Sequence, residues 1–575
     1  MSSFSAEALA LLRTGRAAEA EALLRQALAR GAADTQSIHM LGFLLATSGR
    51  APEGLPLLDR SIALEPANPG FLDNRAQVLL HMGLLDEAVR DAREVTALAP
   101  RFAEGWLHLA QALRRQGRRE ESLAAAESAL AADPNHAGAA YHAALLRMEA
   151  GDRAAAEEGF LRVLARDPRH AAALVNLGVL QRESGRDAQA LASFARAAEA
   201  EPGNAGAHGN LGVALQSAGR LEEAFGAYQR AGTPEALANA AGLAIELERL
   251  GEAKALYARS AMARPGFADA EYGLAQVALR EQRYAEGWEG YERRFDTDPP
   301  LALARELPMP RLEAASLAQA RCVFLWQEQG LGDKILFTTL LPELERRGIG
   351  AVVELDPRLL GLYRRSFPAF EFVAFEDAPR AYARCDFQLP LGSLPRLFRP
   401  DAGSFRAQPQ ALLRADPARV EAMRAAIAAA GGAPAVAVSW RSPQSGSRRY
   451  LGERKSLPLA RLAAWPALQG TRLLDLQYGD VAEERRAFEA REPGRLVSLP
   501  GLDVREDLEG VAAALVACGR LVTVSNATAH LAGALGVASE LLLPRGWPPF
   551  AYWAAAEGGR SLWYPSVTIV AAPPG

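Results

Sequence analysis

Two patterns of hydrophobic and polar residues divide the chain near residue 300. Up to about residue 297, small residues, glycines and prolines recur at one fixed interval. From about residue 320, short β-rich apolar runs alternate with helical stretches. The first pattern is typical of stacked helix pairs, and the second of parallel sheets with crossover helices. We therefore expect a helical repeat array followed by an α/β half.

The repeat interval is 34 residues. Glycines mark it at Gly15, Gly49, Gly83, Gly117, Gly151, Gly185 and Gly219, and prolines at Pro66, Pro100, Pro134, Pro168 and Pro202. Small residues recur at Ala8, Gly42, Ala76, Ala110, Ala144, Gly178 and Gly212, then after one shorter step at Ala241 and Ala275. This punctuation resembles tetratricopeptide repeats, in which the small residue lets two helices approach, glycine ends the first helix and proline stops the second. We expect nine helix pairs over residues 1–297.

A ladder of polar residues stands two positions before successive small residues, at Asn74, His108, His142, Asn176, Asn210 and Asn239. Amides and neutral imidazoles offer both a donor and an acceptor, so such a ladder can bind an extended peptide through its backbone. The alternative is that asparagine is simply common at this position of such repeats. We expect these residues to contact an acceptor protein.

The second half contains six β-rich runs, at residues 321–326, 351–356, 371–376, 435–440, 472–477 and 520–525. An Ala-rich amphipathic stretch from Pro417 to Ala430 separates them into two groups. The simplest architecture is two small doubly wound domains with a cleft between them. We expect a linker over 298–320, a first lobe over 321–415 and a second lobe over 416–575.

The loop after the first run reads QEQGLGDK and precedes a helix. Its glycines allow close backbone approach, and helix N-termini attract anions. Asp333 follows the carboxyl end of a strand, where open α/β sheets place ligands. It is the candidate general base, with a helix N-cap as its alternative role. Glu328 is a second, weaker base candidate.

Two further segments follow strands in the second lobe. The segment SNATAH places Ser525, Asn526, Ala527, Thr528 and His530 where a helix N-terminus can hold a phosphate. Trp440, Arg441 and Ser442 precede a loop rich in glycine, serine and arginine that ends at Lys455 and Ser456, a basic stretch suited to a diphosphate. We expect both segments to bind the donor, with His530 contacting the leaving group. A structural histidine is the alternative for His530, and a solvated loop is the alternative for the basic stretch.

Composition narrows the function classes. Hydrophobic residues make up 49% of the 575 residues and charged residues 23%, which excludes a disordered or collagen-like chain. The net charge of -4 argues against a nucleic-acid partner, and no apolar run approaches a membrane span. Three scattered cysteines, together with an N-terminus that lacks a signal-peptide pattern, predict a cytoplasmic protein. The only Asp-x-Asp, Asp296-Thr-Asp298, is not at a strand end, so we expect no metal and no cofactor.

The motifs together resemble bacterial proteins that join tetratricopeptide repeats to a glycosyltransferase of two Rossmann-like domains, related to the heptosyltransferases. The resemblance covers nearly the whole chain and rests on residues 284–295, 328–333, 389–395, 525–536 and 562–566. It implies that Asp333 is the base, that Lys455 contacts donor phosphate, and that the SNATAH segment lies beside the donor. Ser525-Asn526 stand where heptosyltransferases have Asp-Thr, so a heptose donor is not implied.

Related tetratricopeptide enzymes modify flagellin with nonulosonic acids from CMP-sugars, and O-GlcNAc transferases also resemble this arrangement. The expected fold is therefore an α superhelix followed by an α/β GT-B fold, two Rossmann-like domains with a cleft. The expected function is metal-independent transfer of a sugar from a nucleotide sugar to Ser or Thr of a protein, with flagellin as a candidate. A lipid or polysaccharide acceptor and a non-catalytic repeat scaffold are the alternatives.

Overall fold

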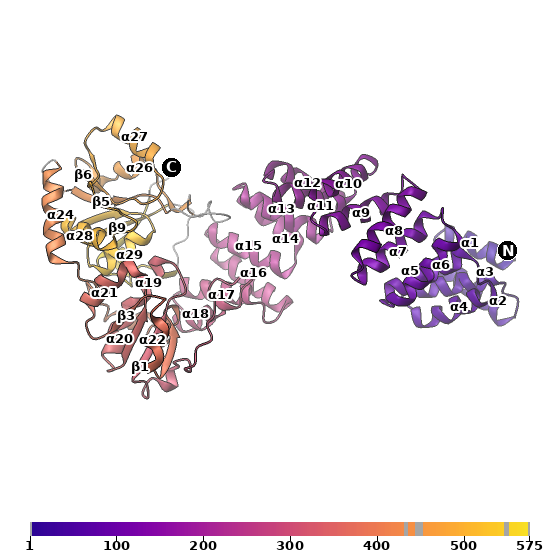
Figure 1. Cartoon of the computed structure of the whole chain (residues 1–575), viewed down its shortest axis with the longest axis horizontal. Coiled ribbons are helices and arrows are strands. Elements are labelled where there is room, and N and C mark those ends of the chain that lie inside the picture. Colours follow the sequence, from indigo (N-terminus) through magenta and orange to yellow (C-terminus); the bar gives the residue numbers. More distant parts are fainter. Residues whose placement is uncertain (1–2, 431–434, 443–451, 453, 545–550, 573–575) are drawn as a thin grey trace. The chain divides into compact units, whose positions relative to one another are not determined.

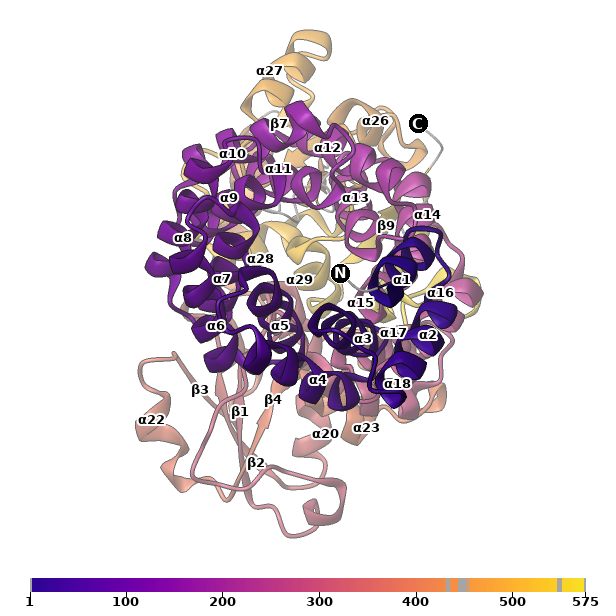
Figure 2. The same cartoon turned by 90° about the vertical axis from the view of Figure 1, so that its right-hand side faces the viewer.

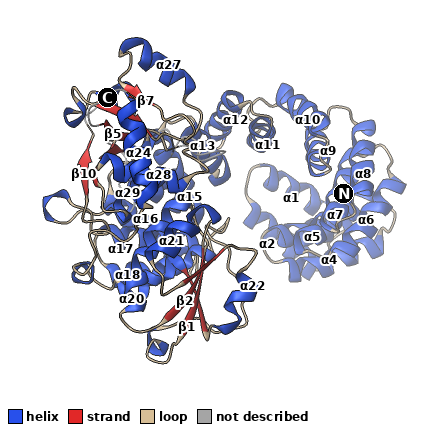
Figure 3. Cartoon of the chain, turned by 60° about the vertical axis from the view of Figure 1, so that its left-hand side comes forward, coloured by secondary structure: helices blue, strands red, loops and turns tan. Residues whose placement is uncertain are grey.

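The computed structural model describes residues 3–430, 435–442, 452, 454–544 and 551–572. The chain forms two compact units, Met1–Ala214 and Leu215–Gly575. The described part of the first unit is helical, and both β-sheets lie in the second unit (Figure 1, Figure 3). The boundary between the units falls within the repeats, so the last repeats pack as one unit with the sheets.

The described residues up to Phe295 form nine helix pairs, as the repeat interval predicts. The first helices are α1 (Ser3–Arg13), α3 (Thr35–Thr47), α5 (Pro69–Met82), α7 (Ala103–Arg115), α9 (Ala137–Glu149), α11 (Ala171–Glu183), α13 (Ala205–Ser217), α15 (Pro234–Glu246) and α17 (Ala268–Arg280). The second helices are α2 (Ala17–Ala29), α4 (Ala51–Leu64), α6 (Leu85–Leu98), α8 (Arg119–Ala132), α10 (Arg153–Arg166), α12 (Asp187–Ala200), α14 (Leu221–Ala231), α16 (Leu250–Ala263) and α18 (Tyr284–Tyr291), which continues as the 3-10 turn η1 (Glu292–Phe295). Within the first unit, the pairs from α3/α4 to α11/α12 follow one another along an arc (Figure 2).

The predicted punctuation has the predicted geometry. Each of the seven recurring glycines from Gly15 to Gly219 has a φ between 72° and 82°, the left-handed region that glycine adopts without a steric cost. The small residues are contact points between helices, because a Cβ added to Gly178 would lie 2.6 Å from the ring of Phe194. Any larger side chain there would push the paired helices apart.

Two repeats carry a non-glycine residue in the left-handed cap. After the shorter step in the repeat, Glu248 and Gln282 occupy the position, with φ values of 61° and 58°. A left-handed backbone costs an L-residue about 1–2 kcal/mol. Glycine avoids this cost, but its greater conformational freedom in the unfolded chain offsets part of the gain in stability. We expect Gln282→Gly to raise the free energy of unfolding by about 0.5–1 kcal/mol in urea titrations. The reverse change Gly151→Gln should lower it, and equal stability of all three proteins would contradict this account.

The first sheet contains four parallel strands in the order β3-β2-β1-β4. They are β1 (Cys322–Trp326), β2 (Gly350–Glu354), β3 (Glu371–Val373) and β4 (Phe387–Pro390). The helices of this lobe are α19 (Leu331–Phe337), α20 (Leu341–Glu345), α21 (Leu360–Ser366), α22 (Ala378–Ala381) and α23 (Leu394–Phe398). Three of these strands match predicted runs, whereas β4 was not predicted.

The second sheet contains six parallel strands in the order β10-β9-β8-β5-β6-β7. They are β5 (Ala435–Ser439), β6 (Arg472–Asp475), β7 (Leu496–Val497), β8 (Arg520–Thr523), β9 (Ala538–Leu543) and β10 (Val567–Ala571). Its described helices are α24 (Pro417–Ala429), α26 (Leu459–Ala463), α27 (Ala482–Arg491), α28 (Leu508–Cys518) and α29 (Ala527–Ala534). Counted from β5 this is the doubly wound order 3-2-1-4-5-6, whose direction reverses between β5 and β8, and such a reversal opens a ligand crevice at the carboxyl ends of the strands.

Helices α17 and α18 belong to the core of the second unit. Tyr284, Trp288 and Tyr291 are buried in one apolar cluster with residues of both sheets. The Trp288 ring lies edge-on to Phe337 of α19, with centroids 6.5 Å apart, and to Trp563, which precedes β10, at 6.2 Å. The last repeat therefore shares its hydrophobic core with the α/β half.

Candidate active site

A cavity of about 320 Å³ opens between segments that follow strands of both sheets. Its size is within the range of small-ligand sites, about 300–1,000 Å³. Residues selected from the sequence that line it are Asp333, Ser442, Lys455, Ser525, Asn526, Ala527, Thr528 and His530. The fold thus brings the loop after β1 together with the segments after β5 and β8.

Asp333 is the third residue of α19, and Gly330 is the N-cap of that helix. The N-cap alternative therefore applies to Gly330, not to Asp333. Burial in the cavity raises the pKa of Asp333 to about 6, while a hydrogen bond from the Gly330 backbone and the positive charge of Lys455 oppose that shift. At neutral pH most of this carboxylate is ionised, and its pKa is close enough to neutral for it to accept a proton reversibly.

His530 is buried on the first turn of α29, among aromatic rings. Its Nδ1 lies 3.1 Å from the Tyr564 hydroxyl, and its ring centroid lies 4.6 Å from that of Trp553. Burial, reinforced by the nearby Lys455 charge, lowers the pKa of His530 to about 3. The imidazole is therefore neutral, and it can offer a ligand one hydrogen bond but no positive charge.

The segments after β5 and β8 are joined by hydrogen bonds. Asn526 caps α29 by accepting from the Ala529 amide, and its Nδ2 donates to the Ser439 hydroxyl at 2.9 Å and to the Arg441 carbonyl at 3.2 Å. The Ser442 amide donates to Ser456 Oγ at 3.0 Å. Ser456 thus supports the wall that Ser442 lines, and Lys455 next to it is buried in the cavity lining.

The structure corrects two of the donor-binding predictions. The Trp440 side chain is fully buried in the core of the second sheet, and its indole N–H donates to Glu484 at 2.8 Å. The Arg441 guanidinium also pairs with Glu484, at 3.0 and 3.1 Å, and does not line the cavity. Both side chains therefore pair with Glu484 within the second lobe and do not line the cavity. The basic loop at residues 443–451 lies outside the described residues.

Glu328 is the third correction. Its carboxylate accepts hydrogen bonds from Arg294 at 2.8 and 3.1 Å and from the Gly392 amide at 2.8 Å. Burial raises the pKa of Glu328, and the Arg294 guanidinium opposes that shift. Because its oxygens are engaged by fixed donors, Glu328 does not have the freedom of a general base.

Four residues with polar side chains line the cavity without having been predicted from the sequence: Arg358, Tyr478, Arg505 and Tyr552. Arg358 follows β2, donates to Asp356 at 2.8 and 2.9 Å, and reaches the Arg505 carbonyl of the other lobe at 2.8 Å. Tyr478 and Arg505 follow β6 and β7, and Tyr552 follows β9. Arg358 and Tyr478 have the signal that identified Asp333, a position beyond the carboxyl end of a predicted strand, whereas Arg505 and Tyr552 follow strands that the sequence did not predict.

The polar ladder of the repeats divides into buried and accessible residues. His108 and His142 are buried, and His108 Nδ1 lies 2.7 Å from Asp73. Asn74 and Asn176 donate to His39 at 2.9 Å and to Tyr141 at 3.0 Å, each 35 residues earlier, so these contacts join successive repeats. Asn210 is partly exposed and Asn239 exposed. The asparagines thus reach the surface, whereas the two histidines do not offer their side chains to a peptide.

Neither a metal cluster nor a membrane-spanning helix is found in the part of the chain that the structure describes. No group of three or more His, Cys, Asp or Glu side chains there could hold a metal ion. No helix there has the length and apolar character needed to cross a bilayer.

Lys334 lines a different cavity of the first lobe, of about 820 Å³, which Glu354 and Phe375 also line.

Gly332 places the two lobes in direct contact. A Cβ added at Gly332 would lie 2.8 Å from Cδ2 of His530, so only glycine lets α19 approach α29 this closely. We expect Gly332→Ala to lower the free energy of unfolding by about 1–3 kcal/mol, the usual cost of overpacking, although alanine favours helices. In urea titrations the double variant Gly332→Ala/His530→Ala should lose less than the sum of the single variants, because the clashing ring is gone. Strict additivity would contradict the contact.

Comparison with known proteins supports the repeat assignment. The tetratricopeptide repeat family model matches residues 74–137, 141–205 and 184–236. A thermophilic tetratricopeptide repeat protein of Thermus thermophilus is 26% identical, with a TM-score of 0.28, over 32% of this chain and 100% of its own. A tetratricopeptide repeat protein of Parabacteroides merdae is 17% identical, with a TM-score of 0.34, over 40% of this chain and 90% of its own. The residues that the family model matches are therefore tetratricopeptide repeats, and they lie within the N-terminal helical array.

The match to a curated relative is longer than the match to the repeat family. Protein FlbA of Caulobacter vibrioides is 32% identical over 343 residues, which cover 55% of this chain and 55% of that protein. The chain thus spans about half the length of the curated relative that it matches.

Proposed function

We propose that the chain is a metal-independent glycosyltransferase that moves a sugar from a nucleotide sugar to Ser or Thr of a protein recruited by the repeats, in the cytoplasm. The observation that carries this proposal is the cavity itself, in which Asp333 from one lobe faces Lys455, His530 and the start of α29 from the other. Two doubly wound sheets facing one cavity are also what a GT-B fold requires.

The charges of the cavity favour an anionic ligand. Among the described lining residues, Lys455, Arg358 and Arg505 carry positive charges and Asp333 carries the one carboxylate, while Asp356, which pairs with Arg358, lies outside the lining. The N-terminus of α29 borders the same space, where a helix N-terminus favours phosphate, although its Ala529 amide is already bonded to Asn526. A nucleoside mono- or diphosphate sugar fits this balance, and a CMP-linked nonulosonic acid adds a second anionic group that the neutral Ser525-Asn526 pair tolerates.

The reaction follows from these positions. The acceptor hydroxyl oxygen forms a bond to the anomeric carbon as its proton passes to the Asp333 carboxylate. The bond between the anomeric carbon and the phosphate oxygen breaks, and its electron pair leaves with the nucleotide. Lys455 and the N-terminal dipole of α29 stabilise the negative charge that grows on the phosphate, and neutral His530 donates its remaining N–H there when Tyr564 donates to Nδ1. One such electrostatic contact typically contributes about 3–4 kcal/mol to lowering the barrier.

The donor and the acceptor can be tested together. Thermal shift with CMP-, UDP-, GDP- and ADP-sugars should identify one class that stabilises the chain, and intact-mass spectrometry should then show one sugar mass added to the acceptor, with flagellin tested first. Activity should persist in EDTA. Failure of all donors to stabilise the chain, together with no mass gain, would reject the enzyme. Transfer to lipid or polysaccharide instead would reject a protein acceptor, and rescue by manganese after EDTA would reject metal independence.

Acceptor capture should depend on the accessible part of the ladder. Asn176 and Asn210 lie in the first unit, partly exposed on α11 and α13. We expect Asn176→Ala/Asn210→Ala to weaken pull-down of the acceptor at least tenfold, because each amide would lose about 1–1.5 kcal/mol of hydrogen bonding to a peptide backbone. Asn135→Ala, at an exposed turn between repeats, is the matched control. Equal capture by all three proteins would show that the acceptor binds elsewhere.

A further inference from the structure

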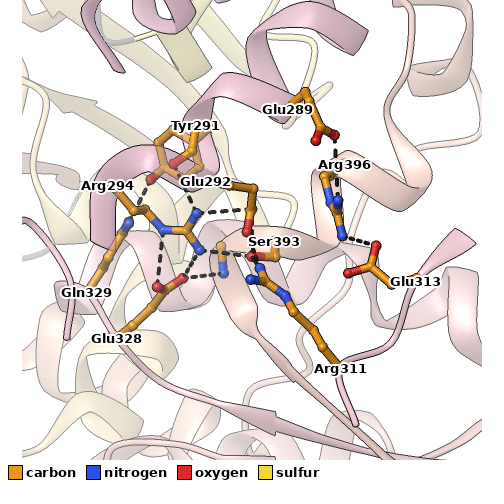
Figure 4. Close-up of polar contacts among 11 residues, drawn as sticks. Glu289, Tyr291, Glu292, Arg294, Arg311, Glu313, Glu328, Gln329, Ser393 and Arg396 are labelled. Carbon is orange, nitrogen blue, oxygen red and sulfur yellow. Dashed lines mark hydrogen bonds and ion pairs between the residues drawn. The ribbon is translucent and has the colours of Figure 1, made fainter. Parts of the chain in front are cut away.

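The last repeat reaches the loop that leads to Asp333. Tyr291, at the end of α18, and Arg294, in η1, are three residues apart and project from one side of the turn (Figure 4). They contact Gln329 and Glu328, two consecutive residues of the loop between β1 and α19 (Figure 4). Asp333 is four residues beyond Gln329.

The contact between Tyr291 and Gln329 is reciprocal. The Tyr291 hydroxyl donates to Gln329 Oε1 at 3.0 Å, and Gln329 Nε2 donates back to the hydroxyl at 2.7 Å. The tyrosine ring is itself fixed by an edge-on contact with Trp288, with centroids 5.5 Å apart. This pair of hydrogen bonds fixes the amide plane of Gln329, immediately before the N-cap Gly330.

Arg294 holds the neighbouring residue from the interior. Its side chain is fully buried, forms two hydrogen bonds to Glu328, and bonds the Ser393 hydroxyl at 2.9 Å. Ser393 in turn donates to Glu292 at 2.7 Å, and Glu292 pairs with Arg311 as well as Arg294. The ionic network therefore connects the end of the repeats, the loop after β1 and the loop after β4, where Gly392 donates to the same Glu328 carboxylate.

The loop is held at both ends. On one side Glu328 and Gln329 are fixed by the last repeat, and on the other Gly332 packs against His530. A loop fixed at these points has little freedom to move the first turn of α19. We propose that Tyr291 and Arg294 are positioning residues: they hold the loop from Gln327 to Gln329 so that Asp333 stands in the register needed for proton transfer. The last repeat then supports the catalytic centre from outside the cavity.

This proposal rests on the proposed function, because the rate of proton transfer is its final readout. The variant Tyr291→Phe keeps the ring and its packing and removes only the hydroxyl that Gln329 binds. We expect hydrogen exchange of the amides in 327–337 to become at least fivefold faster, with an unchanged melting temperature. We expect kcat to fall about 10- to 100-fold, the effect of small misplacement of a reacting group. KM for the donor should remain within twofold, since Tyr291 does not line the cavity.

Arg294 needs a variant that leaves no buried charge without a partner. Replacement of Arg294 by alanine would leave the buried Glu328 carboxylate without its positively charged partner, and that alone could prevent folding. The double variant Arg294→Met/Glu328→Gln removes both charges of the pair and leaves Glu292 with Arg311. It should reproduce the faster exchange and lower kcat of Tyr291→Phe. The matched control is Arg396→Met, because Arg396 pairs with Glu289 of α18 and with Glu313 but does not contact the loop (Figure 4).

Three outcomes would overturn the proposal. Unchanged exchange in Tyr291→Phe would show that the loop holds itself. Equally fast exchange in Arg396→Met would show that any contact at this interface has the same effect. Faster exchange with an unchanged kcat would show that the loop does not position Asp333. A wild-type chain without transferase activity would reject the proposed function. Because hydrogen exchange needs no substrate, it would still show whether Tyr291 and Arg294 hold the loop.

Discussion

Asp333→Asn is expected to lower the rate of sugar transfer by about 10²–10⁴-fold, the usual contribution of a general base. The amide keeps the size of the side chain but cannot accept a proton at neutral pH. Gly330, not Asp333, is the N-cap of α19, and the amide oxygen of the variant can still accept the hydrogen bond that the Asp333 carboxylate receives from the Gly330 amide. The variant should therefore fold, bind the donor and capture the acceptor. Activity close to that of the wild type would assign the base to another group.

Stability should change in the opposite direction from activity. The pKa of Asp333, about 6 in the folded chain, is above the ordinary value of 3.8, so folding favours its protonated form. Below pH 3.8 the group is protonated in both states and contributes nothing. Between pH 3.8 and 6 the carboxyl ionises in the unfolded chain but stays protonated in the folded chain, so the folded chain progressively loses stability, by about 1–3 kcal/mol in full above pH 6. Asp333→Asn should therefore be more stable than the wild type at pH 8 and equally stable at pH 3.5.

The pH dependence of kcat gives a separate measure of the same group. The rate should fall tenfold for each unit below pH 6, as the base becomes protonated. Lys455 lowers the pKa of Asp333 in the wild type, so Lys455→Met should move this limb of the profile to higher pH. Asp386→Asn is the matched control, because Asp386 accepts from the Arg321 and Cys322 amides outside the cavity. If the limb does not shift in Lys455→Met, the lysine does not affect the pKa of the base.

The repeats could be predicted almost completely from the sequence, because their signal is local and recurs nine times. Glycine, proline and small residues each have a backbone or packing role that operates within one helix pair. The sheets were harder to predict. The run 387–390 contains glutamine and ends in proline, β7 has only two residues, and β9 lies in an apolar stretch that also suits a helix. Such strands are defined by their neighbours in the sheet rather than by their own composition.

Residues of the candidate site could be predicted where they follow a predicted strand. They could not be predicted where tertiary packing determines which way a side chain points. Ser525 follows a predicted strand and lines the cavity, and the same rule applied to β2 would have added Arg358, whereas Arg505 follows the unpredicted strand β7. Trp440 also follows a strand, yet its ring turns into the core and meets Glu484. Glu328 meets Arg294 from a segment 34 residues earlier in the chain, a contact that no local pattern encodes.

The chain should not be separable at the end of its repeats. The fragment 298–575 contains every strand and every residue of the cavity, but it lacks Tyr284, Trp288 and Tyr291, which are buried among residues of both sheets. Loss of one large buried aromatic side chain costs about 3–5 kcal/mol, so three cost about 9–15 kcal/mol. The whole stability of a domain is about 5–15 kcal/mol, and Glu328 would also lose its buried partner.

We therefore expect 298–575 to lack a cooperative thermal transition and near-ultraviolet circular dichroism. The matched fragment 221–575 begins at α14 and keeps α17 and α18, so it should unfold cooperatively and bind the donor that stabilises the full chain. It should fail to capture the acceptor wherever capture needs the first unit. A folded, donor-binding 298–575 would show that the aromatic residues of the last repeat cover the α/β half without supporting it. A 221–575 fragment that fails to fold would show instead that stability requires the earlier repeats as well.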